Sequence, residues 1–99
     1  MSGDDSFGSA SPPFDADAAV VSLKRTLRDL KLAERGHVFE QRGKRVVELA
    51  VDSGAIQAKL ARRLVATPEW DRSTLKSAAD QRKFVDEVKK RLARWEHDE

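Results

Sequence analysis

The sequence of 99 residues contains no cysteine. Disulfide bonds and thiolate metal sites are therefore excluded as a means of stabilising the fold. A chain of this length forms one domain at most and buries only about 60–65% of the surface that its unfolded form exposes. Oligomerisation would bury more apolar surface, so a homo-oligomer is one expectation for this protein.

A long apolar run is also missing, since no stretch approaches the roughly 18–20 apolar residues that cross a bilayer. The start of the chain, MSGDDSFGSASPPFDADA, is acidic and polar and lacks the basic and apolar regions of a secretory signal. We therefore expect a cytoplasmic protein without membrane association.

The third absence is a set of residues arranged for catalysis or ligand binding. The glycines are isolated, and none belongs to a phosphate-binding pattern. His37 is expected near the start of a strand, and His97 lies in a terminal stretch that gives a metal ion no fixed geometry. Carboxylates are plentiful, but each has a nearby cation or lies in a terminal segment. The sequence predicts no catalytic residue, metal site, cofactor or small-molecule substrate, and so a protein that is not an enzyme.

Basic residues are concentrated in the middle of the chain. All 19 Lys and Arg residues lie between Lys24 and Arg94, together with 10 acidic residues, which gives this span a formal charge of +9 and leaves −7 for the ends. Such a distribution is typical of a mixed-charge soluble surface, and it is also compatible with an anionic partner such as nucleic acid.

Composition divides the chain into three parts. Residues 1–14 are mainly Gly, Ser, Asp and Pro, which predicts a disordered acidic tail. Residues 15–96 are expected to form a single α+β domain, and residues 97–99 a frayed acidic C-terminus.

Two helices are predicted from apolar residues at helical spacing. The first begins at Asp15 or Asp17, and Gly36 provides its stop signal. Leu75 falls out of phase with the second helix, so residues 73–80 are expected to form a separate or kinked turn. The two apolar stripes comprise Val20, Leu23, Leu27 and Leu30, and Phe84, Val88, Leu92 and Trp95.

Between the helices the period changes to that of a strand, in KRVVELAVD at residues 44–52. If Ser53-Gly54 is a two-residue hairpin loop, residues whose numbers sum to 107 pair, so Val51, Leu49 and Val47 face Ile56, Ala58 and Leu60. Glu48 then lies opposite Lys59. The alternative is a helix capped by Ser53, but that helix would place charged residues beside Ile56. The hairpin is favoured.

A further strand is predicted at residues 37–41, joined to the next by a turn at Arg42-Gly43. In this register Val38 faces Val47, whereas Phe39 faces Val46 on the reverse side of the sheet, near Ala61. The trio Phe39, Val46 and Ala61 is interpreted as an exposed partner contact or as a minor apolar cluster.

The segment ATPEWDRST reads as a connection, because Pro68 interrupts a strand there. Trp70 within it is interpreted as a lid over the core or as a base-stacking platform. The predicted fold is therefore α+β, with the order helix, three-stranded antiparallel β-sheet, helix (αβββα), and with both helices packed on one face of the sheet.

Five cations are expected at one end of this sheet. Arg45 and Arg62 are predicted cross-strand neighbours, and like charge there must be solvated or bound to an anion. Phosphate contacts at this point would give binding that weakens steeply with salt. The five residues are Arg42, Lys44, Arg45, Arg62 and Arg63.

The segments RDLKLAERGHVFE and TPEWDRSTLKSAADQRKFVDEVKKRLARW resemble a small uncharacterised family of Burkholderia-type bacterial proteins, over roughly residues 24–95. The resemblance implies a cytosolic protein and supplies no site residues. The order of elements is also similar to that of the double-stranded RNA-binding domain. The chain departs from that family where it contacts phosphates, since it has STLKSAAD and QRGKR in place of a Lys-rich helix start and a Gly-Pro-x-His loop.

The sequence therefore predicts a non-enzymatic binding domain that acts on a protein partner or on itself. Nucleic-acid binding through the basic residues, to double-stranded RNA or DNA, is the alternative.

Overall fold

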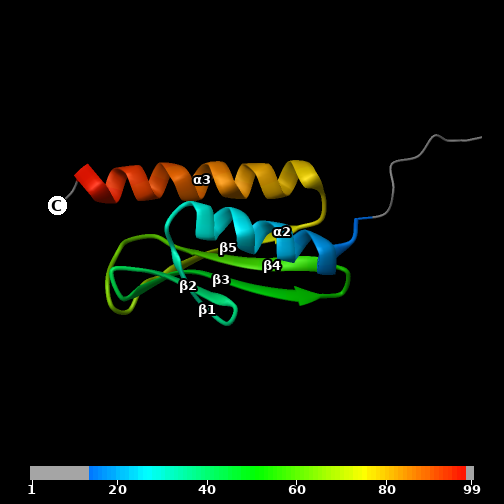
Figure 1. Cartoon of the computed structure of the whole chain (residues 1–99), viewed down its shortest axis with the longest axis horizontal. Helices are drawn as coiled ribbons and strands as arrows, with labels where there is room; N and C mark the ends of the chain where they lie inside the picture. The colour runs from blue at the N-terminus through cyan, green and yellow to red at the C-terminus, as the bar shows by residue number, and fades with distance from the viewer. Residues whose placement is uncertain (1–13, 98–99) are drawn as a thin grey trace, which may run out of the picture.

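The chain folds in the order helix, five strands, helix. The computed structural model describes residues 14–97, so most of the predicted tail and residues 98–99 lie outside the described residues. The strands form one antiparallel sheet in which each strand lies next to its successor along the chain. Both helices lie on the same side of this sheet (Figure 1). The elements are α2 (Ala16–Asp29), β1 (Ala33–Arg35), β2 (Val38–Gln41), β3 (Lys44–Asp52), β4 (Ala55–Ala61), β5 (Trp70–Leu75) and α3 (Ala78–His97).

The prediction of a three-stranded sheet is wrong, because β1 and β5 add a strand at each edge. Gly36 does not end the first helix; it has φ of 66° in the two-residue turn between β1 and β2. Pro68 does not interrupt a strand, because β5 begins after it, at Trp70, and includes Leu75. With five strands, the order of elements no longer matches that of the double-stranded RNA-binding domain.

Both helices begin at side-chain caps. The Ala18 N–H donates to the Asp15 carboxylate at 3.2 Å, and the Asp80 N–H donates to the Ser77 hydroxyl at 3.1 Å. Each cap satisfies a backbone donor that has no partner within the helix. The predicted apolar stripes are confirmed as the helix faces that pack on the core, with Leu23, Leu27, Phe84, Val88 and Trp95 buried.

The hairpin of β3 and β4 has the predicted register, which confirms the pairing of Leu49 with Ala58 and of Val47 with Leu60. Ser53 and Gly54 have φ of 54° and 74°, the left-handed values that a tight two-residue hairpin loop requires. The helical alternative for this segment is wrong. On the face away from the helices, Lys59 Nζ lies 3.9 Å from a carboxylate oxygen of Glu48.

The neighbouring hairpin of β2 and β3 contains a β-bulge that the sequence did not predict. Its turn is as expected, with Gln41 opposite Lys44, but the register shifts between Phe39 and Glu40, and Val46 becomes an extra residue in β3. Phe39 consequently pairs with Val47 and faces the helices. An ion pair of 3.6 Å between Arg45 and Glu48 fits this bulge, because residues three apart in a regular strand point to opposite faces.

The expectation of an exposed contact trio is therefore wrong. The bulge turns Phe39 toward the helix layer, where it is 0% exposed, and Val46 and Ala61 are 1% and 0% exposed. All three belong to the main hydrophobic core. The trio offers no surface to a partner.

We expect Phe39→Ala to lower the free energy of unfolding by about 3–5 kcal/mol, because it leaves a cavity in the core. Val21, which is 65% exposed on α2, is a matched control, and Val21→Ala should change stability by less than about 0.5 kcal/mol. Urea unfolding followed by tryptophan fluorescence measures both. Equal stability of the two variants would show that Phe39 does not lie in the core.

Candidate binding site at the edge strand

The five predicted cations do not form one patch. The bulge places Arg45 on the face away from the helices, where it pairs with Glu48, whereas the Nε of Arg62 donates to Asp71 at 2.8 Å. Asp71 in turn contacts Arg91 of α3, so Arg62 is directed to the helix side of the sheet and Arg45 to the opposite face. The prediction that Arg45 and Arg62 are cross-strand neighbours is therefore wrong. Arg42 lies in the β2–β3 turn, Lys44 begins β3, and Arg63 follows β4. Nucleic-acid binding through these residues stays a prediction.

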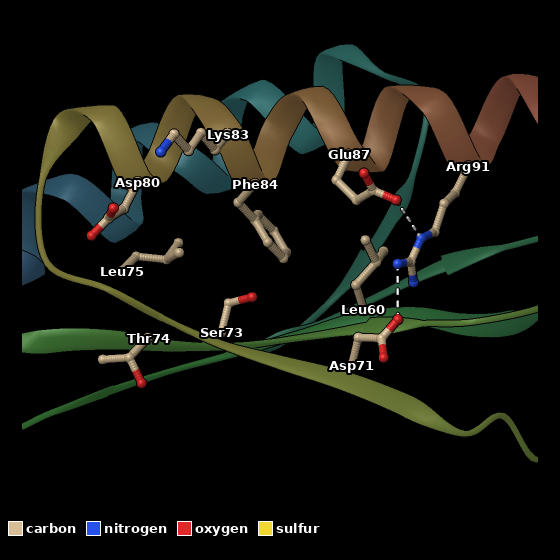
Figure 2. A pocket seen from close by; sticks show the side chains of 10 residues that line it. All are labelled: Leu60, Asp71, Ser73, Thr74, Leu75, Asp80, Lys83, Phe84, Glu87 and Arg91. Atoms are coloured by element: carbon tan, nitrogen blue, oxygen red, sulfur yellow. Dashed lines mark hydrogen bonds and ion pairs between the residues drawn. The ribbon is translucent and has the colours of Figure 1, made fainter.

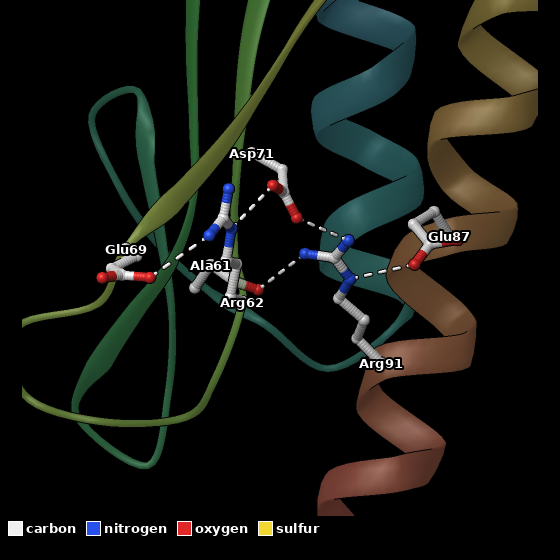
Figure 3. Close-up of polar contacts among 6 residues, drawn as sticks. All are labelled: Ala61, Arg62, Glu69, Asp71, Glu87 and Arg91. Carbon is white, nitrogen blue, oxygen red and sulfur yellow. Dashed lines mark hydrogen bonds and ion pairs between the residues drawn. The ribbon is translucent and has the colours of Figure 1, made fainter.

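Arg91 of α3 fastens the helix to the hairpin of β4 and β5 (Figure 3). Its Nη2 lies 2.8 Å from an Asp71 oxygen, its Nε donates to Glu87 at 2.9 Å, and its Nη1 donates to the Ala61 carbonyl at 3.0 Å. Every nitrogen of this guanidinium therefore has an acceptor, and its side chain is only 13% exposed. Because the contacts come from β4, β5 and α3, they fix the position of the helix over the sheet edge.

Asp71 is the carboxylate on which this cluster centres. Hydrogen bonds from Arg62 and then Arg91 hold the pKa of Asp71 below its ordinary value of 3.8. Reciprocally, the hydrogen bond and charge of Asp71 raise the pKa of Arg62. Since the folded pKa of Asp71 is depressed, its stabilising contribution is present at neutral pH and is lost as the pH falls through that depressed value.

Among residues 14–97, β5 lies at the edge of the sheet and has only β4 as a neighbour. The Arg62 N–H donates to the Glu69 carbonyl at 2.9 Å, which makes this a hydrogen-bonded pair of the β4–β5 ladder. Hydrogen-bonded and non-bonded pairs alternate in an antiparallel ladder, so Asp71 and Ser73 bond to β4. The backbone N–H and C=O groups of Trp70, Arg72 and Thr74 therefore point away from β4, toward the free edge.

The opposite edge of the sheet is formed by β1, which has only three residues, all exposed. A very short edge strand offers little backbone to another chain, and this is one way in which proteins protect sheet edges. β5 has six residues. It is therefore the edge that presents a usable backbone ladder.

A groove of about 240 Å³, here called the edge groove, lies between β5 and α3. The side chains of Leu60, Leu75 and Phe84 form its apolar part, and the small side chain of Ser73 leaves space below the ring of Phe84 (Figure 2). Charged groups flank this apolar part. They are Asp80 and Lys83 toward the start of α3, and Asp71, Glu87 and Arg91 further along.

The edge and the groove together can hold an extended chain. A strand that pairs with Trp70, Arg72 and Thr74 would direct every second side chain toward the helix side, into the edge groove. Sequence reasoning missed this site because residues 70–75 were interpreted as a connection. The available signal was the presence of the strand-forming residues Trp70 and Thr74 in that segment.

Within residues 14–97, no cluster of three or more His, Cys, Asp or Glu residues could hold a metal ion. No helix in this range is long and apolar enough to cross a membrane. Comparison of the chain with protein-family models, with curated proteins and with solved structures finds no match. The resemblance to a family of Burkholderia-type bacterial proteins therefore stays a prediction.

We expect Asp71→Asn to be less stable than the wild type at pH 7. The difference should begin to shrink below about pH 4, where the carboxylate of the unfolded wild type becomes protonated, and should shrink further as the pH falls toward the depressed pKa of the folded protein. Urea midpoints measured between pH 7 and pH 3 give the difference at each pH. The same series on Asp86→Asn, an exposed carboxylate of α3 outside the Asp71 cluster, is the control. A difference that stays constant with pH would contradict the assigned role of Asp71.

Proposed function

We propose that this non-enzymatic cytoplasmic domain binds a protein partner by taking one extended segment of it as a sixth strand beside β5. The observation that carries the proposal is the row of outward-facing backbone groups on Trp70, Arg72 and Thr74, which runs beside the edge groove. In this mode of recognition the main-chain hydrogen bonds supply affinity, and pockets for alternate side chains supply specificity.

The residues of β5 define which segment fits. The side chain of Arg72 is exposed on the face away from the helices, so a residue paired with it is favoured when it is acidic. The two neighbours of that residue point to the helix side and reach the edge groove, where Leu75 and Phe84 favour apolar side chains. The preferred segment therefore has the pattern apolar, acidic, apolar.

The charge of Arg72 also limits self-association through β5. Antiparallel pairing of two copies of β5 about Arg72 would place two arginines directly opposite each other, which is unfavourable. Pairing about Ser73 would instead place Arg72 opposite Thr74 of the other copy. A foreign segment avoids the pair of arginines in either register and can supply an acidic residue opposite Arg72, and for this reason we favour a separate protein partner.

The proposal predicts that a phage-displayed library of random twelve-residue peptides, selected on the full-length protein, yields peptides with the pattern apolar, acidic, apolar. Binding of synthetic versions should fall at least about tenfold in Arg72→Pro, because proline removes an outward N–H and obstructs pairing. Isothermal titration calorimetry measures the affinities.

Comparing Arg72→Ala with Arg72→Pro separates the loss of the side chain from the loss of the backbone N–H. Arg72→Ala keeps the outward N–H and should retain binding, with a weaker preference for the acidic residue. Arg72→Pro should still fold, because proline is tolerated where the N–H of an edge strand faces solvent, and its circular dichroism spectrum checks this. Peptides that bind Arg72→Pro as tightly as Arg72→Ala would refute strand addition at β5.

A further inference from the structure

A second and larger groove lies on a different side of α3, between α3 and α2. Its volume is about 1120 Å³, and we call it the interhelical groove. The two helices run side by side with their N-termini at the same end of the molecule (Figure 1). The residues that line the groove lie between Phe14 and Thr26 on one side and between Lys76 and Lys89 on the other. None of its lining residues belongs to the edge groove.

The floor of the interhelical groove is made of small and apolar side chains. Ala18, Ala19 and Ser22 of α2 face Ala78 and Ala79 of α3 across it, and side chains this small leave space between the helices. Phe14 and Val85 also line the groove, and both are partly buried against the main core. An extended apolar surface of this kind is typical of a site that another segment covers.

The rim of the groove has a small excess of positive charge. Lys76, Arg82 and Lys89 line it and are exposed, while Asp15 and Asp86 are its two carboxylates. Asp15 already accepts a hydrogen bond from the α2 backbone as the helix cap. The groove therefore favours an occupant that combines an apolar side chain with negative charge.

The chain itself contains a segment with this combination of side chains. Residues 1–13, which precede the described residues, include Phe7, Asp4 and Asp5 and contain no Lys or Arg. They are joined to Phe14, which lines the groove, so no intervening linker separates the segment from the site. A short tether of this kind gives an effective concentration in the millimolar range, at which weak contacts suffice for occupancy.

The length of the segment also fits. Phe7 lies seven positions before Phe14, a stretch that spans at most about 25 Å when extended. The α3 side of the groove runs from Ser77 to Lys89, which corresponds to about 18 Å of helix. Phe7 can therefore reach any part of the floor, and Asp4 and Asp5 can reach the rim.

We propose that residues 1–13 of the same chain occupy the interhelical groove, with Phe7 on its apolar floor and Asp4 and Asp5 against its basic rim. The proposal does not depend on strand addition at β5, because the two grooves share no residue. A failure of either one leaves the other standing.

Disulfide trapping in the full-length chain tests this proposal. Because the chain has no native cysteine, only the introduced cysteines can form a disulfide. The test variant combines Ser6→Cys with Ser22→Cys, which lines the groove. The control combines Ser6→Cys with Val21→Cys, whose side chain lies one residue nearer along the chain and outside the groove. We expect the Ser22 pair to form its intramolecular disulfide at least about tenfold faster in a glutathione buffer.

A third variant separates docking from simple proximity. Phe7→Ser with Asp4→Lys and Asp5→Lys, added to the Ser6 and Ser22 cysteine pair, keeps the tether but removes the apolar and acidic groups. Its rate should fall to that of the Val21 control. Equal rates in all three variants would overturn the proposal, and so would a disulfide that joins two chains, because the groove would then be occupied by a second copy.

Discussion

The β-bulge at Val46 in β3 determines which side chains of the sheet point into the core. Because of this bulge, Phe39 turns toward the helices and pairs with Val47, while Arg45 turns to the open face and meets Glu48. On the neighbouring strand Glu34, which pairs with Phe39, is directed to the helix side and contacts Arg28 of α2 at 2.7 Å. Full burial of a phenylalanine contributes about 1.5–3 kcal/mol, a large share of the stability of so small a domain.

At the β5 edge of the sheet, the ion pair between Asp71 and Arg91 positions α3. Asp71 lies on the helix-facing side of β5, opposite Leu60, where an apolar residue would be expected, and the guanidinium groups of Arg62 and Arg91 satisfy it. The contacts of Arg91 hold α3 at a fixed position above β5. Since the neighbouring Ser73 is small, a groove remains under the helix beside an unpaired strand edge. A structural contact thereby creates the surface to which we assign function.

Particular residues show which parts of this arrangement the sequence could predict. The β3–β4 register was predictable because Ser53-Gly54 fixes the turn and only one register places Leu49, Ile56 and Leu60 on one face. The bulge was not, because the Arg42-Gly43 turn is regular and no glycine or proline marks Val46. β5 was missed because its helix-facing residues Asp71 and Ser73 are polar, so the apolar alternation of a half-buried strand is absent. The candidate site could not be found without that strand.

Strand addition requires that β5 present a free backbone edge in the isolated protein. Amide hydrogen exchange measured by NMR tests it residue by residue. The structure predicts alternation, with the amides of Arg72 and Thr74 exchanging fast and those of Asp71 and Ser73 exchanging orders of magnitude more slowly, because only the latter bond to β4. Uniform slow exchange along Trp70–Leu75 would contradict the account, since it would show that the edge is already paired.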